Sequence, residues 1–177
     1  PSPSATVTSN SITITVNPPI TPSILVYDTV ICLGESVTIG AAASGGMGGN
    51  YTYNWLPPIG TGPGPFTVTP SATTAYFVMV SDTCSNPAPD TIIIVVNPVP
   101  SATLNAVPLD GCAPITINFN SNTLGNPPGT TYLWNFGDGG TSSFTNTTHT
   151  YTDSGTYLVG LTATSAEGCS ATFYITS

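Results

Sequence analysis

The sequence contains no lysine and no arginine in 177 residues, although it contains eight acidic residues and one histidine. Proteins that bind nucleic acids neutralise phosphates with Lys and Arg, and segments that attach to anionic membranes are rich in the same residues. The composition therefore excludes nucleic acid and anionic lipid surfaces as partners. It predicts no cofactor, because phosphate groups would find no cation, and it leaves His149 as the one side chain able to form an ion pair.

Long apolar runs are also absent. A membrane-spanning helix needs about 20 consecutive apolar residues, and no stretch of the sequence reaches that length. We therefore expect no direct insertion into a membrane. The sequence shows no signal peptide and opens within a strand pattern, which favours an internal piece of a longer exported protein.

Glycine and proline are abundant, with 18 residues of each. Together with many Thr, Ser, Val and Ile residues they predict short strands joined by turns, and hence an all-β fold. In the first half, strands are expected at 24–27, 36–41, 51–56, 66–69, 74–81 and 91–96. In the second half, they are expected at 102–107, 115–120, 131–136, 148–151, 156–165 and 171–176.

The chain uses one pattern twice. A cysteine precedes a tryptophan by nearly the same interval in Cys32–Trp55 and Cys112–Trp134, and another cysteine follows late in each half. We therefore predict two β-sandwich repeats, residues 20–98 and 99–177. The Asn-Pro-Val-Pro segment between them should be stiff, because proline fixes φ and removes a hydrogen-bond donor.

Residues 1–19 are expected to belong to a further repeat. Their second half aligns with residues 91–99, since both read as a final strand closed by an Asn-Pro pair. The simplest interpretation is the last strand of a preceding repeat. The alternative is donor-strand complementation, in which Ile12, Ile14 and Val16 insert into another copy of the chain.

The second repeat contains an aromatic strand that ends in a glycine-rich turn. Residues 132–140 read YLWNFGDGG, in which Trp134 and Phe136 fall on one face and anchor a core. A His-x-Tyr at His149 and a Gly-Thr-Tyr before a second alternating strand follow. This combination resembles the PKD domain over residues 132–161, which implies an immunoglobulin-like β-sandwich.

The turn after the aromatic strand contains three glycines and one acid. Gly137, Gly139 and Gly140 are expected to supply the positive φ values of a tight turn, and the Asp138 carboxylate to cap backbone N–H groups. As an alternative, Asp138 and Asp153 could hold Ca²⁺, because carboxylate oxygens suit this ion, although the two residues are not spaced as a calcium-binding loop.

His149 could also be written into a hydrolase triad with Asp153 and a serine, but only the residue types support that interpretation. The resemblance instead implies that His149 occupies the His-x-Tyr position of the PKD domain and forms a hydrogen bond locally. The sequence therefore predicts no enzyme.

Three motifs of the first repeat read ICLGESVTI, YTYNW and TTAYFVMV, beginning at residues 31, 51 and 73. They resemble the Ig-like repeats of large type IX-secreted bacterial surface proteins, including gliding-motility adhesins. The two resemblances together give the fold class as all-β, tandem immunoglobulin-like β-sandwich repeats. They imply the stiff stalk of an extracellular adhesin or filament on a bacterial cell surface, with neighbouring repeats of the same long chain as partners.

Several surface features would serve such a stalk. Asn50 and Asn146 fit the N-glycosylation pattern, and Thr29 and Thr91 lie in Asp-Thr-apolar triplets that resemble the O-glycosylation signal of the bacteria that carry these repeats. An outward apolar contact patch, which would meet another repeat or a lateral copy, is predicted at Phe77, Met79, Ile93 and Val95.

A carbohydrate-binding accessory module of a secreted enzyme is the alternative function. Tyr51, Tyr53 and Phe66 could stack on sugar rings, for instance of surface glycans, if they are exposed, whereas in a stalk they would belong to the core.

The four cysteines predict disulfides in an exported protein. Pairing within each repeat, Cys32–Cys84 and Cys112–Cys169, would join opposite poles of a sandwich about 20 Å apart, whereas a disulfide needs Cα atoms within about 7 Å. End-to-end stacking instead brings Cys32 to Cys169. We favour this inter-repeat bond, with Cys84 and Cys112 bonding to neighbouring repeats, and keep the intra-repeat pairing as the alternative.

The missing basic residues lead to a first testable prediction, that trypsin will not cut this chain. Because no Lys or Arg is present, no cleavage site appears even when the chain is unfolded. Digestion of the reduced protein in urea, followed by mass spectrometry, checks this, and a fragment cut inside residues 1–177 would disprove it.

Overall fold

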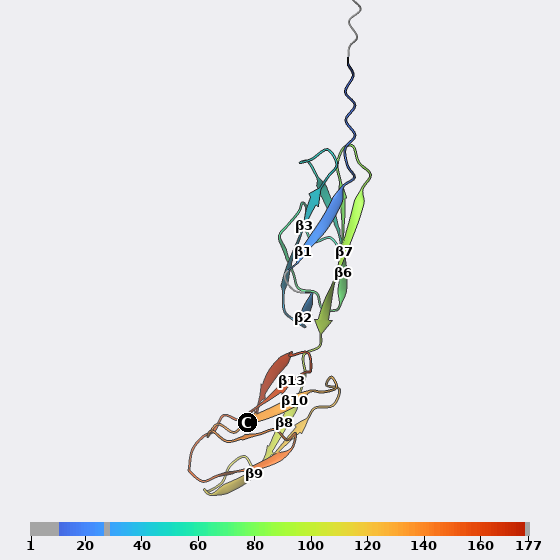
Figure 1. Cartoon of the computed structure of the whole chain (residues 1–177). Coiled ribbons are helices and arrows are strands. Elements are labelled where there is room, and N and C mark those ends of the chain that lie inside the picture. Colours follow the sequence, from blue (N-terminus) through green and yellow to red (C-terminus); the bar gives the residue numbers. More distant parts are fainter. Residues whose placement is uncertain (1–10, 27–28, 176–177) are drawn as a thin grey trace, which may run out of the picture. The chain divides into compact units, whose positions relative to one another are not determined.

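The computed structural model describes residues 11–26 and 29–175, and it places no helix among them. No helix in this part of the chain could cross a membrane. The described residues form fourteen β-strands in four sheets, and Figure 1 shows their arrangement within the chain. The predicted fold class, all-β with immunoglobulin-like β-sandwiches, is confirmed.

The first seven strands form two sheets, with orders β1-β3-β5 and β2-β7-β6-β4. Their bounds are Thr21–Val26 (β1), Val30–Cys32 (β2), Val37–Ser44 (β3), Thr52–Leu56 (β4), Phe66–Val68 (β5), Thr74–Ser81 (β6) and Ala88–Asn97 (β7). Strand β1 pairs antiparallel with β3, and β4 with β6, whereas the short β2 runs parallel to β7.

The core of these strands follows from their alternation. In β6, Tyr76, Val78 and Val80 are buried, as the period of two requires for one face of a strand. Trp55 of β4 lies opposite Val78 and is buried too. Its ring meets the edge of Phe66 from β5 at 6.1 Å between centroids, which closes one sheet onto the other.

The last seven strands repeat this pairing, with sheet orders β12-β9-β8 and β11-β10-β13-β14. Their bounds are Thr103–Val107 (β8), Ile115–Asn122 (β9), Thr131–Asn135 (β10), Thr141–Ser142 (β11), Thr147–Tyr151 (β12), Gly160–Thr164 (β13) and Ser170–Tyr174 (β14). Strand β8 pairs with β9 as β1 does with β3, and β10 with β13 as β4 does with β6.

The core of this second set is aromatic. Trp134, Phe136 and Phe119 are almost fully buried, and Phe119 of β9 contacts both other rings, at 5.6 and 5.1 Å between centroids. Leu161 of β13 lies opposite Trp134 with no exposed surface. The prediction that Trp134 and Phe136 anchor one core is confirmed.

One predicted strand starts too early. We expected a strand over 156–165, but β13 begins at Gly160, opposite Asn135 at the end of β10. The N–H of Phe136 turns away and donates to the carbonyl of Gly140, so β10 offers no partner to residues before Gly160. A pattern in one strand cannot show where the neighbouring strand ends.

Other strand ends moved by up to three residues. Strand β3 continues to Ser44 because its last residues pair with the start of β1 at Thr21. Strand β7 is longer than predicted at both ends. Strands β2 and β11 were not predicted, because two or three residues are too short for a recognisable alternation.

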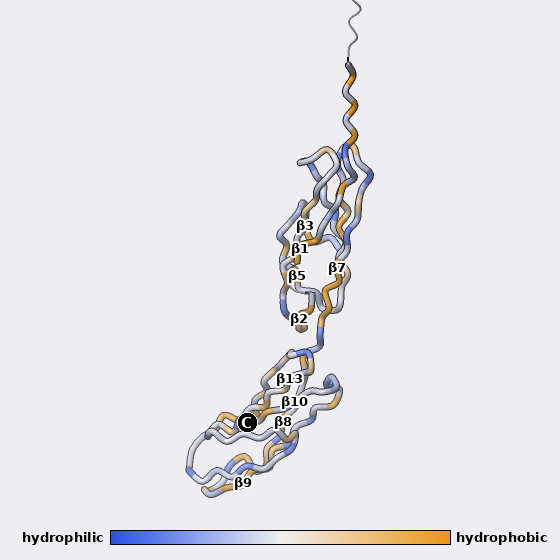
Figure 2. Tube along the Cα trace, viewed as in Figure 1, coloured by the Kyte–Doolittle hydropathy of each residue, from blue (hydrophilic) through white to orange (hydrophobic). Residues whose placement is uncertain are grey.

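Residues 11–20 are extended and take no part in a sheet of the described structure. Ile12, Ile14 and Val16 are 82–87% exposed, and Figure 2 shows hydrophobic residues along this segment before β1. An alternating apolar segment outside any sheet fits both interpretations of this part of the chain, and residues 1–10 of the same call lie outside the described residues.

The described residues form two compact units. One contains 11–26, 38–67 and 75–92, and the other contains 29–37, 68–74 and 93–175. Strand β2 and its turn therefore group with the later strands. The repeat boundaries 20–98 and 99–177 stay a prediction.

Candidate functional site

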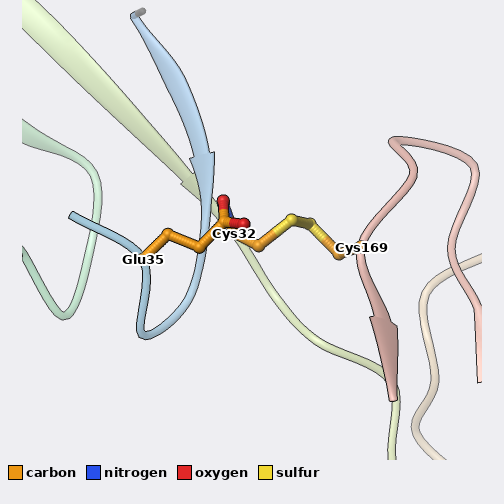
Figure 3. Close-up of a disulfide and its surroundings, with 3 residues drawn as sticks. All are labelled: Cys32, Glu35 and Cys169. Carbon is orange, nitrogen blue, oxygen red and sulfur yellow. A yellow bond between two sulfur atoms is a disulfide. The ribbon is translucent and has the colours of Figure 1, made fainter. Parts of the chain in front are cut away.

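A disulfide joins Cys32, at the end of β2, to Cys169, in the turn between β13 and β14 (Figure 3). The two Cα atoms are 5.6 Å apart, within the range that a disulfide needs. Both cysteines belong to the second compact unit. This is the pair that the topological argument favoured.

The turn that follows Cys32 holds it in place. The backbone N–H of Cys32 donates to the Glu35 carboxylate at 2.8 Å, and the Glu35 N–H donates to the Cys32 carbonyl at 3.0 Å (Figure 3). Leu33 donates to the carbonyl of Asn97 at 2.9 Å, which extends the parallel pairing of β2 with β7. The missed strand β2 is therefore what carries one half of the disulfide.

Cys84 and Cys112 are exposed and free in the structure. The alternative bonds Cys32–Cys84 and Cys112–Cys169 are not formed, because Cys32 and Cys169 pair with each other. The bonds predicted from Cys84 and Cys112 to neighbouring repeats remain a prediction.

Asp82 organises the turn that carries Cys84. Its carboxylate accepts hydrogen bonds from the backbone N–H groups of Met47, Cys84 and Ser85. These backbone donors favour the ionised form, led by that of Ser85, and lower the pKa of Asp82 from 3.8 to about 2.

Replacing Asp82 with Asn should lower stability above about pH 4 and have little effect below about pH 2. The folded-state pKa of Asp82, about 2, lies below the ordinary 3.8. The ionised carboxylate therefore stabilises the fold above the ordinary pKa, and this contribution is lost as pH falls through the folded value. Urea titrations of both chains over this pH range check the prediction, and a difference that does not change with pH would contradict it.

The second candidate site lies in the glycine-rich turn after β10. His149 Nε2 lies 2.6 Å from Asp138 Oδ2, and the imidazole stacks on Phe136 at 4.2 Å between centroids. The other Asp138 oxygen accepts from the Gly140 N–H at 2.8 Å. The His149 hydrogen bond, followed by that of Gly140, lowers the pKa of Asp138.

Asp138 caps the turn as predicted, but the role of Gly140 differs. Gly137 and Gly139 have φ of 83° and 96°, whereas Gly140 does not have a positive φ. A Cβ on Gly140 would lie 2.6 Å from His149 Cε1. Gly140 is thus required by the closeness of the imidazole, which the sequence alone did not indicate.

The candidates for calcium binding and for hydrolysis have different hydrogen-bond partners. Asp138 is hydrogen-bonded to His149, whereas the Asp153 carboxylate meets Thr152 and the Asp153 carbonyl accepts from Tyr157. In the triad as written, His149 would pair with Asp153; in the structure its partner is Asp138. Among the described residues no three His, Cys, Asp or Glu side chains cluster as metal ligands would.

The four residues of the predicted contact patch are exposed. Phe77, Met79, Ile93 and Val95 show 46, 42, 53 and 36% of their surface, and β6 and β7, which carry them, are neighbours in one sheet. The structure adds two apolar residues that sequence reasoning missed. Leu56 lies opposite Phe77 and Val30 opposite Val95, and both are more than half exposed.

The proposed sugar-stacking residues are half-buried. The Tyr51 hydroxyl donates to the carbonyl of Gly45 at 2.6 Å, and its ring meets Tyr53 edge to face. Phe66 packs on Trp55. These contacts place the three rings at the margin of the core rather than as a free stacking platform.

A cavity of about 610 Å³ is lined by the sheet β12-β9-β8 and by neighbouring loop residues. Its wall is largely apolar and includes Ile115, Ile117 and Val159, with Tyr157 stacked on Tyr151 at 4.2 Å. Asp110 and Asp153 also line it. The cavity suits an uncharged ligand and, through its two carboxylates, disfavours an anion.

The modification candidates lie at the surface. Thr29, Thr91, Asn50 and Asn146 are all exposed. The Asn146 side chain is engaged, since its Oδ1 accepts from the backbone N–H of Ser121 at 3.0 Å.

Residues 95–176 match the PKD domain family, so a PKD domain is present in this part of the chain and that resemblance is confirmed. A microbial collagenase of Vibrio alginolyticus is 44% identical over 59 residues, 32% of this chain and 7% of the collagenase. Collagenase ColA of Bacillus cereus is 57% identical over 37 residues, 21% of this chain and 4% of the collagenase. The chain thus spans only a small part of these curated relatives.

Proposed function

We propose that the chain consists of non-catalytic structural repeats from an extracellular adhesin or surface filament, and that these repeats form a stiff stalk with covalent links. The observation that carries this proposal is the Cys32–Cys169 bond, which ties β2 to the turn between β13 and β14 across a sequence separation of 137. A link over such a long stretch limits how far the chain can be pulled out.

The side chains support a role without catalysis. PKD domains occur as non-catalytic modules, including in collagenases. The one histidine is held between Asp138 and Phe136, and the chain has no Lys or Arg to polarise a substrate. The proposal assigns no catalytic residue.

The location is also part of the proposal. Disulfides persist in oxidising compartments, and the chain holds one between Cys32 and Cys169. We place the protein outside a bacterial cell, at the cell surface, with Thr29 and Thr91 as exposed O-glycosylation candidates. Neighbouring repeats of the same long chain are its first partners.

A second function, that of a carbohydrate-binding accessory module in a secreted enzyme, is favoured by two observations. The relatives are collagenases, and the PKD domain contains the aromatic cavity beside Tyr157. Sugars are uncharged and stack on aromatic rings, so this cavity, rather than Tyr51, Tyr53 or Phe66, would be their site.

A glycan array separates the two functions. We expect the chain, screened at several concentrations, to bind no glycan. Binding that is lost in Tyr157→Ala, and retained in Tyr174→Ala as a control for an exposed tyrosine outside the cavity, would support the accessory module and contradict the stalk.

The contact patch leads to a prediction about assembly. Changing Ile93 and Val95 to Thr should weaken lateral association while the fold remains, because both side chains are exposed and threonine keeps their β-branched shape. Sedimentation at several concentrations checks this. The matched control replaces Leu133 and Leu158, exposed apolar residues outside the patch, and equal association of both variants would refute the role of the patch.

A further inference from the structure

The position of Cys32 relative to the path of the chain is well defined. Cys32 pairs with Asn97 in the parallel ladder between β2 and β7, and Leu33 donates to the Asn97 carbonyl at 2.9 Å. Asn97 is the last residue of β7. Cys32 therefore lies where the chain leaves the final strand of its sheet.

Cys169, the disulfide partner of Cys32, lies where the chain enters the next set of strands. The turn of Cys169 includes Ala166, and a Cβ on Gly129 would be 3.3 Å from the Ala166 Cβ. Asn126, in the same loop as Gly129, exchanges two hydrogen bonds with the backbone of Ser101 at 2.7 and 2.8 Å. Ser101 leads into β8, so the Cys169 turn lies beside the incoming end.

In the earlier strands, Cys84 occupies the position that Cys169 has in the later strands. It lies in the turn between β6 and β7, as Cys169 lies between β13 and β14. Asp82 of this turn binds the N–H of Met47 at 2.8 Å, and the adjacent Gly46 donates to the carbonyl of Pro18 at 2.8 Å. Pro18 leads into β1, so Cys84 also lies beside an incoming end.

In the later strands, Cys112 occupies the position that Cys32 has in the earlier strands. It precedes β9 as Cys32 precedes β3. The residues around it, Gly111 and Ala113, line the same cavity as Ile175. Ile175 follows β14 directly and donates to the Val159 carbonyl, so the neighbours of Cys112 share a cavity with the outgoing end of the strands.

We propose that Cys112 forms a disulfide with the late-turn cysteine of the repeat that follows, and Cys84 with the early cysteine of the repeat that precedes. Cys32–Cys169 supplies the pattern, since it joins an outgoing-end cysteine to an incoming-end cysteine. Cys112 is the exposed, free cysteine at the outgoing end, and Cys84 is the exposed, free cysteine at the incoming end. A second copy of this chain, placed end to end, provides both partners. The inference rests on the proposed function because it requires repeats in tandem.

The bond needs an external oxidant. Two thiols lose two protons and two electrons as the S–S bond forms. A disulfide of the glutathione class takes them up: the first cysteine thiolate attacks it, which forms a mixed disulfide and releases one thiol, and the second cysteine thiolate attacks the mixed disulfide, which closes the bond and releases the other thiol.

The test uses a full copy of the chain followed in tandem by a second copy that lacks residues 1–16. The second copy begins at Asn17, so that the Asn-Pro-Pro of residues 17–19 connects it to the first. Cys84 of the first copy and Cys112 of the second are replaced by Ser, which leaves free thiols only at the junction. In a glutathione redox buffer we expect the thiol count to fall to zero in the monomeric tandem chain. Non-reducing peptide mapping with a protease that cleaves after acidic residues should recover Cys112 linked to Cys84.

The matched control also carries Cys112→Ser in the first copy and should retain one free thiol. Two unreacted junction thiols under conditions that keep Cys32–Cys169 intact would overturn the inference, and so would peptides linking Cys32 to Cys84. If the tandem chain forms the junction bond but also binds glycans, the proposed stalk function is contradicted and the proposed disulfide is not. Free junction thiols without glycan binding would count against this inference alone.

Discussion

Replacing Trp134 with Ala should destabilise the PKD domain by about 3–5 kcal/mol, the usual cost of removing a buried tryptophan. Trp134 has no exposed surface and packs against Phe119 and Phe136. Its indole N–H donates to the Phe144 carbonyl at 3.0 Å, so the substitution leaves both a cavity and an unpaired carbonyl. Small domains unfold at a cost of only about 5–15 kcal/mol, and this loss is a large part of that total.

Urea titrations followed by circular dichroism measure this effect. The control is Leu133→Ala, because Leu133 precedes Trp134 in the same strand and is 51% exposed. We expect the control to change stability by a small fraction of the Trp134→Ala loss. Equal losses in the two variants would mean that the aromatic face is not the core.

Removing the disulfide should be the other large effect. With a sequence separation of 137, the loop-entropy relation gives about 5 kcal/mol for Cys32→Ser combined with Cys169→Ser. The link restricts the unfolded chain, so its loss favours unfolding even where native contacts remain.

The matched control for the disulfide replaces Cys84 and Cys112, which are free and exposed, and should leave the urea midpoint nearly unchanged. Reducing agent should lower the urea midpoint of the natural chain and of the control alike. It should not change the urea midpoint of the variant in which Cys32 and Cys169 are both replaced. A midpoint that reduction does not change would refute the prediction.

Much of the fold could be predicted because its signals are local. The alternation of Trp134 and Phe136 with exposed neighbours predicts one buried face whatever the partner strand is, and the structure buries both rings. Gly137, Asp138 and Gly139 identify the turn from backbone chemistry alone. Local patterns of this kind also gave β6 its correct bounds, Thr74–Ser81.

The parts that failed depend on a distant partner. The start of β13 is set by where β10 ends at Asn135, and the requirement for Gly140 comes from His149, which arrives from β12. The short β2 forms only because β7 offers its edge. None of these pairings leaves a periodic signal in the residues themselves.

The candidate site shows the same division. Cys32 and Cys169 could be chosen as partners because a pole-to-pole distance follows from strand length, without side-chain detail. The cavity beside Tyr157 could not be predicted from the sequence, since it depends on residues 156–159, which run outside the sheets.

Single-molecule pulling on the ends of the chain tests the central claim, that the Cys32–Cys169 bond limits extension of a stalk. The bond encloses a sequence separation of 137, so these residues are shielded from force while it is intact. At 3.3–3.6 Å per residue, reduction should lengthen the fully extended chain by roughly 450 Å. We predict this gain in the natural chain and in the control lacking Cys84 and Cys112. The same extension before and after reduction would contradict the account.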